Sequence, residues 1–219
     1  MCGRYSLALD PEDVAHLMEG FPVPTAPDGW HRARWNIAPT QPVLVGTAEG
    51  WAWNPWGVRL GDRLVINARS ETAFERFGRG IAHRRCLVPA DGFYEWAHLG
   101  RRRLPFRFHP PGGALWTFGG ILHRDKRGDA LLVLTTTAHS SVAPYHDRTP
   151  VIVPGEDRAR WLDPAIHAPA QLEDVLLPRA EAHMQRTPVS TAVNRVATDD
   201  PSCHAQRLDE PVAQMGFRF

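Results

Sequence analysis

Short apolar runs, rich in β-branched and aromatic residues, recur along most of the chain with turn residues between them. Gly112-Gly113 and Lys126-Arg127-Gly128-Asp129 are two such turns. This arrangement is typical of antiparallel strands. The pattern predicts strands at residues 42–47, 51–58, 86–88, 93–97, 105–109, 115–122, 131–137 and 151–153.

Helical periodicity is confined to short segments. Asp10-Pro11-Glu12-Asp13 combines an N-cap, a proline at the first helical position and acids in the first turn, which predicts a helix over 10–19. Further short helices are expected near 70–77, 156–162 and 170–176. The expected fold is α+β, a single domain over residues 1–219 with a strongly bent, mostly antiparallel sheet or open β-barrel and short peripheral helices.

Composition narrows the function classes only slightly. A formal net charge of +1 is too small for binding of nucleic acid by bulk charge, so a polyanion site must be a local patch. Only Lys126 of the 25 basic residues is a lysine, and arginine suits phosphate, although a GC-rich genome explains this bias better. The first twenty residues contain no apolar run for a signal peptide or membrane helix, so we expect a cytoplasmic protein.

The three cysteines, Cys2, Cys86 and Cys203, are odd in number and widely scattered. This spacing argues against both a disulfide framework and a structural zinc site. His83 stands three residues before Cys86, but a metal would need further ligands. We therefore expect no metal ion, and because the sequence has no GxGxxG or GxxxxGK(S/T) phosphate loop we expect no organic cofactor either.

Cys2 directly follows Met1, and removal of that methionine would make it the first residue. It would then carry a thiol and a free α-amine, a pair that can condense with an aldehyde to close a thiazolidine ring. The α-amine has a pKa near 8, so roughly a tenth of it is neutral at pH 7, far more than for a lysine. Cys2 is thus a candidate nucleophile, although position alone does not establish this, because any cytosolic protein can carry cysteine there.

Residues 66–72, Ile-Asn-Ala-Arg-Ser-Glu-Thr, pass from an apolar strand end into a helix start. Asn67 could orient a nucleophile or a carbonyl group, or simply be a turn residue. Arg69 lies near a helix N-terminus, where anions are favoured.

Two further segments hold candidate proton carriers. Glu95 stands between Tyr94 and Trp96 in a predicted strand, where lost solvation would raise its pKa toward neutrality. The alternative places Glu95 on the solvent face of that strand. His146 lies in a loop with an acid and an arginine beside it, a setting in which histidine exchanges protons at physiological pH.

Seven ordered motifs together resemble the SRAP family, the SOS response-associated peptidases. They cover nearly the whole chain and are MCGRY (1–5), WNIAP (35–39), INARSET (66–72), RCLVPADGFYEW (85–96), LTTTA (134–138), HDRTP (146–150) and PVSTAVN (188–194). Members of this family are sensors of abasic sites in single-stranded DNA.

The resemblance implies that Cys2, after loss of Met1, forms a stable thiazolidine with the ring-opened aldehyde of an abasic deoxyribose. It implies that Glu95 and His146 move protons and that Asn67 holds the terminus. The expected partner is abasic single-stranded DNA, bound by a monomer that is nucleoid-associated on DNA. The implied DNA-binding residues are Arg4, Asn36, Pro39, Arg69, Trp96, Thr135 and Arg148.

The chain departs from the family pattern after Trp56. Residues 57–63 run almost directly into Asn67, without the longer stretch, containing a proline and a further tryptophan, that wedges against DNA. The resemblance therefore does not predict a preference for strand junctions.

Three other functions stay open from the sequence. Glutamine amidotransferases and other N-terminal nucleophile hydrolases also begin Met-Cys-Gly and use the cysteine thiol. A thiol peptidase would use Cys2 to cleave the Met1–Cys2 bond or other peptides. A non-catalytic single-strand DNA-binding module would bind intact and abasic strands equally.

Overall fold

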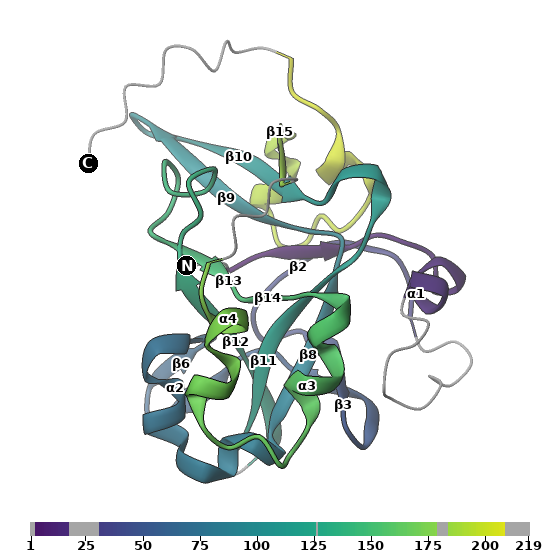
Figure 1. Cartoon of the computed structure of the whole chain (residues 1–219). Helices are drawn as coiled ribbons and strands as arrows, with labels where there is room; N and C mark the ends of the chain where they lie inside the picture. The colour runs from purple at the N-terminus through teal and green to yellow at the C-terminus, as the bar shows by residue number, and fades with distance from the viewer. Residues whose placement is uncertain (1–2, 18–30, 126, 179–183, 209–219) are drawn as a thin grey trace.

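The computed structural model describes residues 3–17, 31–125, 127–178 and 184–208, and its strands form two sheets and a hairpin (Figure 1). The first sheet has the strand order β15-β10-β9-β1-β2, and its neighbouring strands are antiparallel. Its strands are β1 (Tyr5–Leu7), β2 (Arg34–Ile37), β9 (Gly92–Leu99), β10 (Arg102–His109) and β15 (Gln185–Pro188).

The second sheet has the order β13-β12-β11-β8-β3-β4, with β14 beside β11 and β7 beside β12. The pairing of β7 with β12 is parallel, and the other pairs in this sheet are antiparallel. Its strands are β3 (Pro42–Thr47), β4 (Gly50–Pro55), β7 (Asn67–Arg69), β8 (Arg85–Ala90), β11 (Trp116–Asp125), β12 (Gly128–Thr137), β13 (Arg148–Pro150) and β14 (Ile152–Val153). A separate hairpin joins β5 (Val58–Leu60) to β6 (Arg63–Val65).

The helices are short and peripheral. The α-helices are α1 (Pro11–Leu17), α2 (Ser70–Phe77), α3 (Arg158–Leu162) and α4 (Glu173–Leu176). The 3₁₀ turns are η1 (Gly78–His83), η2 (Pro111–Gly113), η3 (Gly155–Asp157), η4 (Pro169–Leu172), η5 (Thr191–Asn194) and η6 (Pro201–His204). Helices α2, α3 and α4 cover one side of the second sheet (Figure 1), and their buried residues share a cluster with Leu87, Ile121 and Leu134.

One hydrophobic cluster lies between the two sheets. Phe93 and Phe106 enter it from the first sheet, and Val88 and Phe118 enter it from the second. Phe93 contacts Phe118 edge to face, with the ring centroids 6.2 Å apart. This shared core holds the two sheets in a fixed position relative to each other, and so fixes the relative positions of the residues that they carry.

The predicted fold class, mostly antiparallel sheets with short helices, is confirmed, and both sheets stay open over the described residues. The strand predicted at 51–58 was wrong at its end, because β4 stops at Pro55 and Gly57 takes a φ of 111°. Trp56 turns inward instead, where it is fully buried and its Nε1–H donates to Ile66 O at 2.9 Å. The helix predicted over 10–19 is present as α1 to Leu17, and residues 18–19 lie outside the described ranges.

None of the described helices combines the length and the apolar character needed to cross a membrane.

Candidate functional site

Cys2, the predicted nucleophile, lies outside the described residues. The other two cysteines are buried thiols at 0% exposure. Burial raises the pKa of both Cys86 and Cys203, which keeps them as inert neutral thiols. Neither described cysteine therefore has the exposed, ionised sulfur that a nucleophile needs.

Glu95 lies on the inward face of β9. Side chains alternate along a strand, so Glu95 shares its face with the core residues Phe93 and Ala97. It is only 4% exposed, and burial raises its pKa to about 7, helped by the negative charge of Asp147. Its Oε1 atom has no hydrogen-bond partner among the described residues. The alternative of a solvent-facing Glu95 is wrong, and the carboxyl group can both give and take a proton near neutral pH.

The loop that carries His146 packs over the same strands. Phe106 lies opposite Glu95 in the pairing of β10 with β9. The Tyr145 ring, one residue before His146, contacts the Phe106 ring at a tilt of 50°, with the centroids 4.7 Å apart. This contact and the electrostatic effect of Asp147 on Glu95 show that the sheet and the loop bring the two predicted proton carriers into one region.

The His146 ring has two neighbours at one nitrogen. The backbone N–H of Arg148 donates to Nδ1 at 2.9 Å, and a backbone N–H can only donate, which assigns the proton of the neutral ring to Nε2. Oδ1 of Asp147 also lies 2.9 Å from Nδ1, a contact that is favourable only when Nδ1 carries a proton. We favour the first arrangement for the neutral ring, and the second becomes available when the ring is protonated.

Three strands bring together further predicted residues at the end of the second sheet. Asn67 lies opposite Val133, and Arg69 lies opposite Thr135, in the parallel pairing of β7 with β12. Arg148 lies opposite Thr137 in the antiparallel pairing of β13 with β12. Asn67 is half-buried, and Arg69 is exposed at the start of α2.

The guanidinium group of Arg148 is already paired with a carboxylate of the same chain. Its Nη1 and Nη2 donate to the two carboxylate oxygens of Glu71 at 2.6 and 2.7 Å, and Nη2 also donates to the Thr135 carbonyl oxygen. The hydroxyl of Thr135 donates to Ala68 O at 3.4 Å, and Thr135 is only 2% exposed. A phosphate can reach the fork of Arg148 only if Glu71 gives way.

A second group lies on the outer face of the first sheet. Nη1 of Arg4 donates to Asn36 Oδ1 at 2.6 Å and to Val193 O at 2.9 Å. Trp96, half-buried, has the guanidinium carbons of Arg103 and Arg4 at 5.1 and 5.9 Å from its ring centroid. Its face is therefore already an arginine-stacking platform.

Asn36 and Pro39 were predicted to contact the DNA strand, but neither side chain is fully exposed. Asn36 is 0% exposed, and its Nδ2 donates to the carbonyl oxygens of Arg195 and Thr198 at 2.9 and 2.6 Å. Any influence of Asn36 on a bound strand would act through Arg4. Pro39 is half-buried in the loop after β2.

Sequence reasoning missed Glu71 and Arg103 as parts of these groups. Glu71 was visible as an acid in the first turn of a predicted helix, but its partner lies 77 residues later. Arg103 was one of three consecutive arginines, and nothing local distinguished it from its neighbours.

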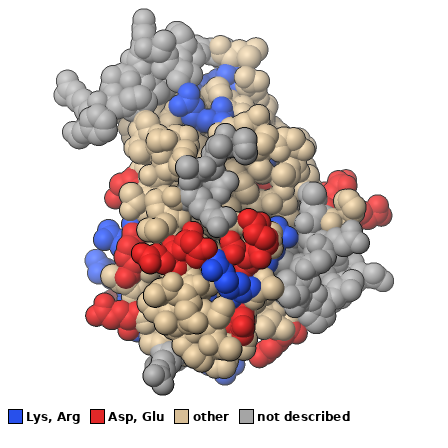
Figure 2. Space-filling model, viewed as in Figure 1, with Lys and Arg blue, Asp and Glu red and all other residues tan. Residues whose placement is uncertain are grey.

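Acidic side chains gather in a band across the middle of the face shown in Figure 2, in the region of α3 and α4. Arg160 lies within this region and pairs with Asp157 at 2.9 Å and Asp174 at 2.5 Å. A band of this sign disfavours phosphate groups.

Within the described ranges, no three His, Cys, Asp or Glu residues are placed to hold a metal ion.

The fold and site define an α+β protein with a buried carboxyl group beside a histidine loop. The family model for SOS response associated peptidase (SRAP) matches residues 1–196, and the chain belongs to this family. Abasic site processing protein YoqW of Bacillus subtilis (strain 168) is 30% identical over 222 residues, with 92% of this chain and 97% of the relative covered. Abasic site processing protein YedK of Escherichia coli (strain K12) is 27% identical over 188 residues, with 74% and 79% covered. A crystal structure of a protein from Bacteroides thetaiotaomicron has the same fold, with a TM-score of 0.79, 20% identity, and 94% and 100% of the two chains covered.

Proposed function

We propose that this protein captures abasic sites in single-stranded DNA as a covalent thiazolidine on Cys2, after removal of Met1. The observation that carries the proposal is Glu95, whose buried carboxyl group with a pKa of about 7 lies under the loop of His146. The printed names of the relatives, abasic site processing proteins, supply the substrate class.

The chemistry balances without a cofactor. The α-amine of Cys2 adds to the aldehyde carbon of the ring-opened deoxyribose, and the carbonyl oxygen leaves as water to give an imine. The thiolate of Cys2 then attacks the imine carbon, the imine nitrogen takes up a proton, and the five-membered ring closes. One C–N bond and one C–S bond form, and one water is lost.

Each proton transfer has a candidate residue in this chain. Glu95 is about half protonated near neutral pH, so it can protonate the departing oxygen and accept protons from the amine and thiol. His146, with its proton assigned to Nε2, is suited to the sugar oxygen during ring opening. Asn67 would hold the N-terminus in position.

DNA binding would rest on fixed cations and one aromatic platform. In the proposal Arg69, exposed at the start of α2, binds a backbone phosphate, and Arg4 and Trp96 contact the strand at the outer face of the first sheet. In the proposal Pro39 lines the path of the strand, the strand approaches Thr135 and Arg148 where Glu71 gives way, and Asn36 supports Arg4 from inside. Such contacts tolerate any sequence, as a lesion sensor requires. The protein would act at the nucleoid of the cytoplasm.

Incubation with a single-stranded oligonucleotide carrying one abasic site tests the proposal. We expect a heat-stable band on a denaturing gel for the abasic strand and none for the intact strand. Cys2→Ala should abolish the band and keep reversible binding within a few fold. An equal band from Cys2→Ala would contradict the proposal. Loss of Met1 without any band would direct attention to glutamine hydrolysis.

A further inference from the structure

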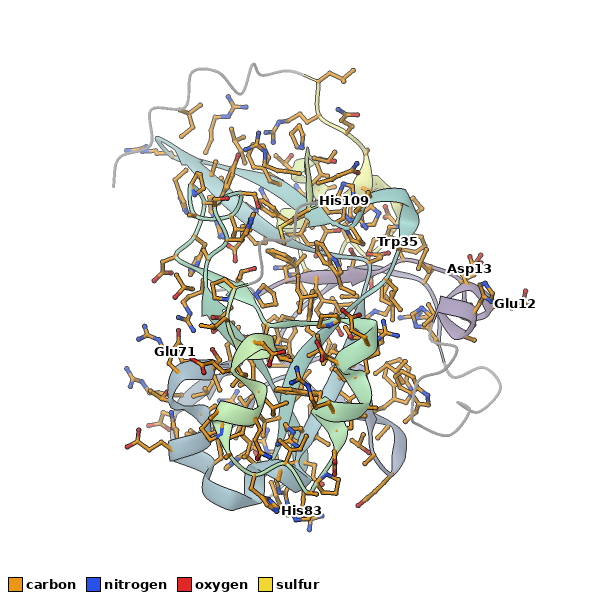
Figure 3. All side chains as sticks on the ribbon, in the orientation of Figure 1. Glu12, Asp13, Trp35, Glu71, His83 and His109 are labelled. Atoms are coloured by element: carbon orange, nitrogen blue, oxygen red, sulfur yellow. The ribbon has the colours of Figure 1, made fainter. Side chains whose placement is uncertain are left out.

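We propose that Glu71 is a positioning residue for His146 and acts through Arg148. Glu71 lies at the start of α2, on a different segment from the histidine loop (Figure 3). The inference rests on the proposed function, because it concerns the orientation of the imidazole that would serve the abasic sugar.

The first link is the bidentate pair between Glu71 and Arg148. Two parallel N–H to oxygen bonds of 2.6 and 2.7 Å fix the plane and direction of the guanidinium group. The Arg148 side chain is 11% exposed and the Glu71 side chain is 47% exposed. The carboxylate therefore clamps a mostly buried arginine from the solvent side.

The clamp is the main side-chain support of this arginine. Its Nη2 has one more acceptor, the carbonyl oxygen of Thr135, and its buried Nε has no hydrogen-bond partner among the described residues. Without the carboxylate of Glu71, the guanidinium would lose the bidentate pair that fixes its plane and could rotate toward solvent. We expect the first residue of β13 to shift with it.

The second link runs from Arg148 to His146 through the backbone. The N–H of Arg148 donates to Nδ1 of His146, and the carbonyl oxygen of Asp147 accepts from Ala138 N at 2.9 Å. The bond to Nδ1 sets both the direction of the ring and the nitrogen that carries its proton. A shift of Arg148 would weaken this bond and leave Asp147 as the partner of Nδ1, which moves the proton of the neutral ring from Nε2 to Nδ1.

Removal of the charge of Glu71 should leave the fold intact. Glu71 lines an open groove of about 410 Å³, together with Thr137, Ala170 and Glu173. Water in this groove can hydrate the freed guanidinium. The matched control is Glu75→Gln, which removes the same charge one turn later from the exposed face of α2.

The test compares wild type, Glu71→Gln and Glu75→Gln in the full chain. Two-dimensional ¹H–¹⁵N spectra of the imidazole nitrogens report the His146 tautomer, assigned by the signal lost in His146→Gln. Single-turnover crosslinking at saturating abasic DNA gives the rate, and binding of a strand with a non-reactive tetrahydrofuran analogue gives the Kd. Glu71→Gln should move the His146 proton toward Nδ1 and slow crosslinking on the order of ten-fold or more, with the Kd within about three-fold. Glu75→Gln should match wild type.

Two results would overturn the inference. One is an unchanged tautomer and rate in Glu71→Gln. The other is tighter DNA binding with an unchanged saturating rate, which would make Glu71 a competitor of phosphate for Arg148. If wild type forms no crosslink, the proposed function fails, and the tautomer comparison still decides whether the clamp orients His146.

Discussion

Glu95 lies directly opposite Phe106 in the antiparallel pair of β9 and β10, so its carboxyl group shares the inward face with an aromatic core residue. Burial on this face, rather than a single charged neighbour, is the main cause of its raised pKa. The same placement that would prepare Glu95 for proton transfer in the proposed reaction also makes it a source of instability at neutral pH.

The stability of Glu95→Gln relative to wild type should be greater at neutral pH than at acidic pH. The folded pKa of Glu95 is about 7, above the ordinary value of 4.5. Between these values the folded protein holds the proton that the unfolded chain releases, so stability falls as pH rises through this window. The loss is on the order of 3 kcal/mol at most. Glutamine does not ionise, so the variant avoids this loss of stability.

Urea unfolding of wild type and Glu95→Gln at pH 4.5 and pH 8 measures this effect. The unfolding free energy of the variant minus that of wild type should be larger at pH 8 than at pH 4.5. A difference that is the same at both pH values would show that Glu95 is not buried as a neutral acid.

Only one thiol should react quickly in the native protein. Cys86 and Cys203 are both 0% exposed, and burial raises their pKa values, so an aromatic disulfide reagent should reach neither. We expect one fast equivalent in wild type, none in Cys2→Ala, and three in denatured wild type. A second fast thiol in the native protein would contradict the burial of these two residues.

Arg85→Met should destabilise the fold strongly. Arg85 is 2% exposed and donates to the carbonyl oxygens of Trp161, Asp163 and Ile166, the last two at 2.6 and 2.9 Å. Burial lowers its pKa to about 10. Its loss leaves three carbonyl groups without this donor, which costs about 3 kcal/mol or more.

The neighbouring Arg84 provides the control for this prediction. Its side chain is 38% exposed and pairs with Asp129 at 2.9 Å, so Arg84→Met should change the unfolding free energy by less than about 1 kcal/mol. Equal losses for the two variants in urea unfolding would show that the three hydrogen bonds of Arg85 to carbonyl oxygens do not stabilise the fold.

Arg69→Ala should weaken DNA binding and reduce its salt dependence. Each phosphate contact to a single strand contributes about 0.7 to the slope of log K against log salt. Arg76→Ala removes the same charge near the far end of α2 and should leave the slope unchanged. Titration of an oligonucleotide at several salt concentrations gives both slopes, and an unaltered slope for Arg69→Ala would place this residue outside the phosphate path.

The fold class and the burial of Glu95 could be predicted because their signals are local. Apolar runs between turn residues marked the long strands, and the aromatic neighbours of Glu95 indicated its burial. Residues 66–72 indicated a strand end before a helix, but the parallel pairing of the short strand β7 with β12 left no signal in the sequence, because three residues are too few to show a period.

The polar partnerships could not be predicted for a related reason. Glu71 and Arg148 are 77 residues apart, and Asn36 is buried by residues more than 150 positions later. These hydrogen bonds depend on how distant segments pack, which no local pattern in the sequence records.

Intact mass spectrometry of the product with an abasic strand tests directly whether Cys2 forms the proposed thiazolidine. We expect one heat-stable species, whose mass equals the chain from Cys2 plus the oligonucleotide minus one water. An adduct that retains Met1, or one that appears only after borohydride reduction, would contradict a thiazolidine on the N-terminal cysteine.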